Sequence, residues 1–181
     1  MKKIFLVTMT IYLLMFGSVA SAETNYNFVP VSDLGTQAFV DRMGNGSVYQ
    51  AMTQKGTLVA FTAPARHAEL DDNENFPGMS VYRSLFGIKD TQTPNGEIRF
   101  YTDSDGKIFI IQFINSGEPQ LSGVVLLMAM EAIGLTDQEA LPLLQTPSAT
   151  AETFCANAGR KILRLIADQQ GNTVFLFGAS N

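Results

Sequence analysis

The chain has 181 residues and a formal net charge of −5, with hydrophobic residues making up 46% of the total. This length suits one domain that can bury a core without disulfide bridges. An acidic chain without basic clusters argues against binding to nucleic acids or to anionic membranes.

The first 22 residues have the order of a secretory signal peptide. Lys2 and Lys3 form a basic region, residues 4–16 are apolar, and Ala20-Ser21-Ala22 fits a cleavage site. The apolar run is shorter than the roughly 20 residues of an ordinary membrane span. We therefore expect cleavage after Ala22 and a periplasmic or secreted product, residues 23–181, that folds as a single globular domain. An uncleaved N-terminal anchor is the alternative.

The first half of this domain shows short elements separated by breakers. Residues 23–31 read as an extended lead-in, and Asp33 as the N-cap of a helix that Gly44 ends. Residues 47–55 predict a second short helix and residues 57–63 a strand. Residues 64–78 lack periodicity and predict a loop. Residues 79–88 fit a helix or a strand, and a helix is favoured.

The strongest local pattern lies over residues 97–114, where two β-rich runs flank Asp103-Ser104-Asp105-Gly106. This pattern predicts a central β-hairpin whose second strand is apolar on both faces. The turn is similar to part of a calcium-binding loop. However, Tyr101 and Gln112 stand where such a loop needs its first and its bidentate last ligand. An ordinary turn without a metal is therefore predicted.

The second half begins with an apolar helix over residues 121–133, in which Glu131 is the only charge. Such a helix must be covered on all sides. We expect the sheet on one side and either the final helix, which is favoured, or another protein chain on the other. Thr136 and Glu139 form a capping box that starts a short helix, which Pro142 is expected to cut short.

A final helix from Thr150 to the breaker Gly171 is predicted from an apolar stripe with helical spacing. Residues 173–177 then predict a closing strand. Together these elements indicate an α+β fold with a mainly antiparallel sheet of about four strands, built around the central hairpin, with helices packed on it.

Cys155 is the only cysteine, which excludes an intramolecular disulfide. Its place on the apolar face of the predicted final helix indicates a buried and unreactive thiol.

Residues 64–78 hold the candidate functional residues. His67 is the only histidine, so any Ser-His-Asp or Cys-His mechanism has to use it, but no G-x-S-x-G sequence presents a serine nucleophile. The acidic side chains around it fit an ordinary solvated loop or contact with a partner protein, and they fit both better than catalysis. The predicted partner-binding residues are His67, Glu69, Asp71, Asp72 and Glu74.

These observations predict an exported, non-catalytic protein-binding module of the inhibitor, immunity, chaperone or assembly-accessory kind. Its expected partner is another protein, and no cofactor, metal or nucleic acid is expected. The alternatives are a small exported hydrolase that uses His67 with loop carboxylates, and a carrier with an apolar cavity between sheet and helices. The sequence leaves the oligomeric state open.

Overall fold

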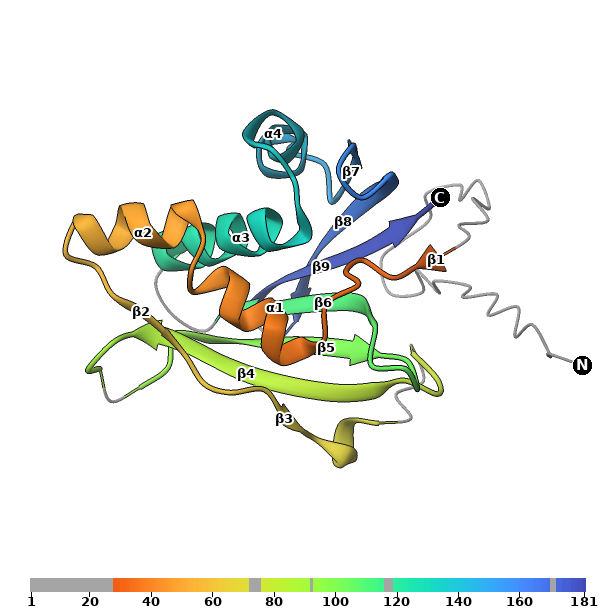
Figure 1. The fold of residues 1–181 in the computed structure, drawn as a ribbon, viewed down its shortest axis with the longest axis horizontal. Coiled ribbons are helices and arrows are strands. Elements are labelled where there is room, and N and C mark those ends of the chain that lie inside the picture. Colours follow the sequence, from red (N-terminus) through yellow and green to blue (C-terminus); the bar gives the residue numbers. More distant parts are fainter. Residues whose placement is uncertain (1–27, 72–75, 92, 116–118, 170–171) are drawn as a thin grey trace, which may run out of the picture.

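The computed structural model describes residues 28–71, 76–91, 93–115, 119–169 and 172–181. The predicted signal peptide lies outside these residues and stays a prediction. The described residues form one antiparallel sheet with α helices on one face (Figure 1). Its nine strands are β1 (Phe28–Val29), β2 (Val59–Phe61), β3 (Ala65–Arg66), β4 (Ser80–Ile88), β5 (Gly96–Thr102), β6 (Ile108–Asn115), β7 (Thr150–Cys155), β8 (Arg160–Gln169) and β9 (Asn172–Ser180).

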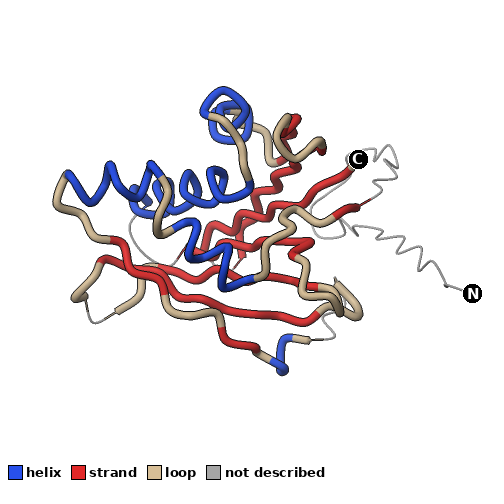
Figure 2. The backbone as a smooth tube through the Cα atoms, in the orientation of Figure 1, coloured by secondary structure: helices blue, strands red, loops and turns tan. Residues whose placement is uncertain are grey.

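The strands lie in the order β2-β4-β5-β6-β9-β8-β7, while β3 pairs with β4 and β1 pairs with β9. All of these pairings are antiparallel. The chain leaves the sheet after β6, forms two helices, and returns through the β7–β8 hairpin (Figure 2). This return places the last strand, β9, in the middle of the sheet between β6 and β8.

The central hairpin is confirmed as β5 and β6. The Asp103 carboxylate accepts hydrogen bonds from the backbone N–H groups of Asp105 and Lys107, at 3.0 and 2.9 Å. Gly106 has φ +78°, a left-handed conformation that glycine adopts without strain. Asp103 and Gly106 therefore both stabilise the turn, as the sequence predicts.

The α+β class and the antiparallel sheet are confirmed, but the estimate of about four strands is wrong. One reason is that residues 79–88, for which a helix is favoured, contain strand β4. Tyr82 and Phe86 pack with the main core, whereas Val81 belongs to a small cluster on the opposite face. That alternation has the period of two that defines a strand.

The predicted final helix is also wrong, because residues 150–169 form strands β7 and β8. Gly159, with φ +64°, closes the turn between them by donating its N–H to the carbonyl of Cys155. Ile162 is buried on the helix-covered face, while Leu163 points to the other. The apolar residues of β8 therefore fit both a helical stripe and a strand with two apolar faces, and pairing with β9 selects the strand.

The helices cover one face of the sheet (Figure 1). They are α1 (Thr36–Met43), α2 (Ser47–Gln54), α3 (Pro119–Ile133) and α4 (Asp137–Gln145). The apolar helix α3 is confirmed, but the prediction that the final helix packs on its outer side is wrong. The N-terminal helices α1 and α2 contact it, because the predicted final helix does not form. None of the described helices is long and apolar enough to cross a membrane.

Two helix boundaries differ from the prediction. Gly35, not Asp33, is the N-cap of α1, and the Asp33 carboxylate instead pairs with Arg160 at 2.8 Å. The capping box of Thr136 and Glu139 is confirmed, but α4 continues through Pro142 to Gln145. This proline lies beyond the first turn, where its ring costs a hydrogen bond without ending the helix.

Cys155 is fully buried at the end of β7, so its predicted burial is confirmed although its helix is wrong. We expect a thiol reagent to label Cys155 in the unfolded protein but not in the native one, since a thiolate must be exposed to react. Mass spectrometry before and after denaturation measures this. Rapid labelling of the native protein would contradict the buried position.

Candidate functional site

Three of the predicted partner-binding residues, His67, Glu69 and Asp71, lie beside strand β4, near its pairing with β3. His67 follows β3, and Glu69 belongs to the short 3-10 helix η1 (Ala68–Leu70). Asp71 ends that turn. Asp72 and Glu74 lie outside the described residues.

Asp71 links the segment after β3 to strand β4 of the sheet. Its carboxylate accepts the backbone N–H of Val81 at 2.8 Å and pairs with Arg66 at 2.7 Å. The hydrogen bond from Val81, followed by the interaction with Arg66, lowers the pKa of Asp71 below its ordinary value of 3.8. These two contacts give Asp71 a structural role. They also explain its lowered pKa without any contact from a partner protein.

The lowered pKa of Asp71 gives a stability prediction with a definite sign. A carboxylate whose pKa is lower in the folded state stabilises the fold above its unfolded-state pKa, and this stabilisation is lost as the pH falls through the folded-state value. We expect Asp71→Asn to melt at a lower temperature than the wild type at neutral pH. It should also lose less stability than the wild type below about pH 3.8. Thermal unfolding across this range measures both effects.

Asp105→Asn is the matched control, because Asp105 is exposed in the hairpin turn. Its acid profile should follow that of the wild type. An Asp71→Asn profile parallel to the wild type would contradict the assigned role of Asp71.

His67 and Glu69 form a pair in which the imidazole Nδ1 lies 2.5 Å from a carboxylate oxygen. Hydrogen bonding to His67 is the main cause that lowers the pKa of Glu69. The Glu69 side chain is largely exposed, and its pKa is also lowered by the charge of Arg83. The pair therefore borders a second group of charges, which the sequence analysis missed.

This second group lies on the face of the sheet opposite the helices, which we call the helix-free face. In the part of the chain that the structure describes, no α helix lies on this face (Figure 1). Arg83 of β4 lies directly opposite Arg99 of β5, which lies opposite Gln112 of β6. Glu97 pairs with Arg99, and also with the Nε of Arg83 at 3.1 Å. We call these four residues the arginine cluster.

The arginine cluster carries more positive than negative charge. Two guanidinium groups share one carboxylate, although like charges directly opposite each other on a sheet are destabilising. The buried Nε of Arg99 has no hydrogen-bond partner among the described residues. The side chains of Arg83 and Arg99 are 35% and 27% exposed, so a carboxylate from outside can reach them.

Tyr101 of β5 lies on the same face as Gln112, and its hydroxyl donates a hydrogen bond to the Gln112 side-chain oxygen at 2.8 Å. Burial raises the pKa of Tyr101, so its hydroxyl stays protonated and keeps this donor at neutral pH. Phe76 lies against the Tyr101 ring, with centroids 4.5 Å apart, and covers it. The hydrogen bond and this packing therefore hold the side chains of Gln112 and Tyr101 in place.

Apolar side chains continue the same face beyond the cluster. Leu176 of β9 lies opposite Gln112, and Leu165 of β8 lies opposite Leu176. Both are partly exposed. Phe154, on the outer strand β7, is 57% exposed. Its cross-strand partner is Lys161, which puts it on the helix-free face as well.

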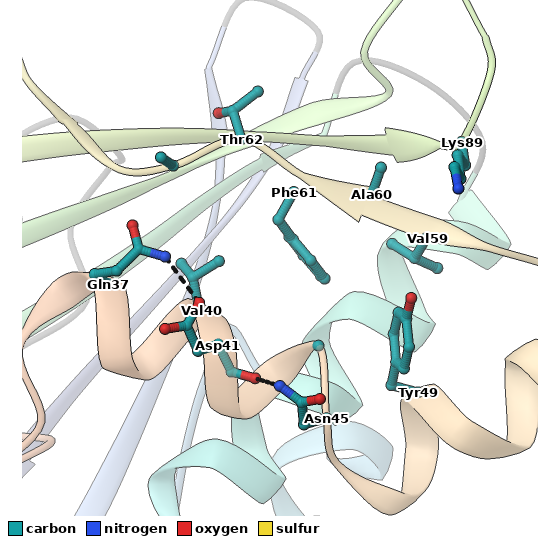
Figure 3. Close-up of a pocket in the computed structure, with 12 residues that line it drawn as sticks. Gln37, Val40, Asp41, Asn45, Tyr49, Val59, Ala60, Phe61, Thr62 and Lys89 are labelled. Carbon is teal, nitrogen blue, oxygen red and sulfur yellow. Dashed lines mark hydrogen bonds between the residues drawn. The ribbon is translucent and has the colours of Figure 1, made fainter.

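An open depression of about 340 Å³ lies between α1, the start of α2 and β2 (Figure 3). Some of its polar side chains bond to one another. Gln37 donates to the Asp41 carboxylate at 2.8 Å, and Asn45 donates to the Asp41 carbonyl at 2.7 Å. Neither His67 nor the arginine cluster borders it.

Among the described residues, no three His, Cys, Asp or Glu side chains converge as a metal site would require. The candidate site is therefore the arginine cluster with the His67–Glu69 pair and the adjoining apolar strip. Comparison with known proteins found no family model, no curated protein and no solved structure that matches this chain.

Proposed function

We propose that this chain is an exported, non-catalytic protein-binding module that contacts its partner through the helix-free face. The observation that carries the proposal is the row of Arg83, Arg99 and Gln112 continued by apolar side chains of β9 and β8. Arginine and aromatic residues supply most of the strong contacts in protein interfaces, and apolar side chains surround them.

The chemistry of the cluster indicates the kind of partner. The chain as a whole is acidic, yet this face concentrates two guanidinium groups around one carboxylate. A second carboxylate, from an Asp or Glu of the partner, would balance the charge and accept bidentate hydrogen bonds. We therefore expect a partner that presents an acidic side chain beside an apolar one.

The environment of His67 favours binding over hydrolysis. A general base needs a cavity that holds substrate and excludes water. Neither the depression beside α1 nor a second cavity beneath α3 includes His67. Its ring pairs with a carboxylate that is 68% exposed. The pair fits the rim of an interface, where it adjusts the charge next to Arg83.

The test is capture of partners from an envelope extract by the immobilised mature protein. Replacing both Arg83 and Arg99 by Gln should reduce the captured protein at least tenfold, and added salt should weaken capture by the wild type. Lys55→Gln, at the exposed end of α2, is the matched control for lost positive charge and should capture normally. Melting temperatures show that each variant folds.

Two results would overturn the proposal. The first is equal capture by the wild type and the double arginine variant. The second is hydrolysis of an ester, amide or glycoside substrate that is lost in His67→Ala, which would support the hydrolase.

A further inference from the structure

A second cavity lies on the helix-covered face, between helices α3 and α4 and strands β8 and β9. Its volume is about 400 Å³, within the usual range for small-molecule sites. Leu126 and Met130 of α3 form one wall, and Phe175 and Phe177 of β9 form the opposite one. The cavity is on the other side of the sheet from the arginine cluster, so it is a separate site.

Of the described residues, Arg164 of β8 is the only charged one that lines this cavity. It is 3% exposed, and no described carboxylate forms an ion pair with it. Its terminal nitrogens donate to the carbonyls of Leu143, Thr146 and Ser148, at the end of α4 and in the loop that follows. These carbonyls orient the guanidinium but leave its charge without a counter-ion.

The Nε of Arg164 is buried and has no hydrogen-bond partner among the described residues. Burial of an unpaired charge is costly, and its effect is visible in the lowered pKa of Arg164. Arg164 therefore brings to the cavity lining a positive charge that no described carboxylate balances, and an anionic group would balance it.

Gly123 adds an independent observation. It lies within α3 and lines the cavity, yet a Cβ at this position would meet no atom within 4 Å. Glycine inside a helix costs up to about 1 kcal/mol relative to alanine. No neighbour requires the missing side chain, so its effect is to keep this part of the cavity open.

We propose that the cavity binds a small amphipathic carboxylate such as a fatty acid. The alkyl chain lies between Leu126 and Phe175, and the carboxylate lies against the Arg164 side chain and balances its charge. Leu144 and Pro147 are exposed where α4 ends, and they border the entrance. The protein then carries a small ligand on one face of the sheet in addition to a protein partner on the other.

The test uses dodecanoate below its micelle concentration, with 1-dodecanol as the uncharged probe of equal length. Titration calorimetry and melting temperature measure binding to the mature protein. We expect saturable binding of dodecanoate at one site, with a higher melting temperature, and at least tenfold weaker binding of the alcohol. Ligand that binds only the native state must raise its stability.

Variants place the ligand in the cavity. Gly123→Leu fills the open space and should weaken dodecanoate binding at least tenfold. Gly123→Ala adds one methyl group, raises helix propensity and should bind less tightly while melting at or above the wild-type temperature. Gln120→Leu adds the same side chain as Gly123→Leu to the same helix, but at an exposed position outside the cavity, so its binding should be unchanged.

Arg164→Gln should remove the preference for the acid over the alcohol. If this variant does not fold, the difference in affinity of the wild type for dodecanoate and 1-dodecanol still measures the contribution of the ligand's charge. Absence of dodecanoate binding to the wild type would overturn the proposal. So would equal affinity for acid and alcohol, or binding that Gly123→Leu leaves unchanged, which would indicate adsorption elsewhere on the surface.

Discussion

Replacing Phe100 by alanine is expected to lower the free energy of unfolding by about 3–5 kcal/mol. Phe100 is 0% exposed at the centre of strand β5. Its ring meets Phe39 of α1 edge to face, with centroids 5.6 Å apart. The substitution removes apolar contacts and leaves a cavity beneath α1. Because small domains have only about 5–15 kcal/mol of stability, this loss is a large fraction of the total.

Phe154→Ala is the matched control, since it removes the same atoms from an exposed strand position. Its free energy of unfolding should stay within about 0.5 kcal/mol of the wild type. Urea unfolding followed by circular dichroism measures both variants. Equal losses in the two would show that the buried contact between sheet and α1 contributes little. Phe154→Ala should instead weaken partner capture, because Phe154 lies on the helix-free face.

Replacing Glu131 by alanine is expected to cost about 2–3 kcal/mol, because its carboxylate caps a distant helix. It accepts hydrogen bonds from the N–H and hydroxyl of Ser47, both at 2.7 Å, and from the N–H of Val48 at 3.2 Å. Ser47 begins α2, and the N-cap Gly46 has no side chain to serve this purpose. A negative charge at this end also complements the helix dipole.

Two further variants separate the parts of this contact. Glu131→Gln keeps an acceptor oxygen without the charge and should lose about 1 kcal/mol. Gly46→Ala should also destabilise, because a Cβ there would lie 2.3 Å from a Glu131 carboxylate oxygen and displace it. If Glu131→Ala unfolds at the same urea concentration as the wild type, α2 does not depend on this cap.

The same contact predicts sensitivity to acid. Burial by itself would raise the pKa of Glu131, but the hydrogen bonds from Ser47 and Val48 outweigh it and lower the pKa from 4.5. The stabilisation is therefore complete above the unfolded-state pKa and is lost as the pH falls below about 4.5. Glu131→Gln should lack this part of the acid dependence, which thermal unfolding across the pH range measures.

Local chemistry in the sequence determined several elements. The turn at Asp103 and Gly106 specified the central hairpin, because the hydrogen bonds of Asp103 and the left-handed conformation of Gly106 lie within five residues of sequence. The capping box of Thr136 and Glu139 started α4 in the same way. The continuous apolar run of residues 121–133 was sufficient to define α3. These signals need no knowledge of distant segments.

Tertiary structure alone decided the rest. Residues 150–169 have apolar positions that suit a helix or a two-faced strand, and pairing with β9 made the choice. Arg83 and Arg99 come from different strands, and only the register between β4 and β5 sets them side by side. The Glu131 cap joins groups 84 positions apart, and the carbonyls around Arg164 come from another element. The sequence determined the contacts that span a few residues, whereas both proposed sites depend on long-range pairing, which single-sequence periodicity does not encode.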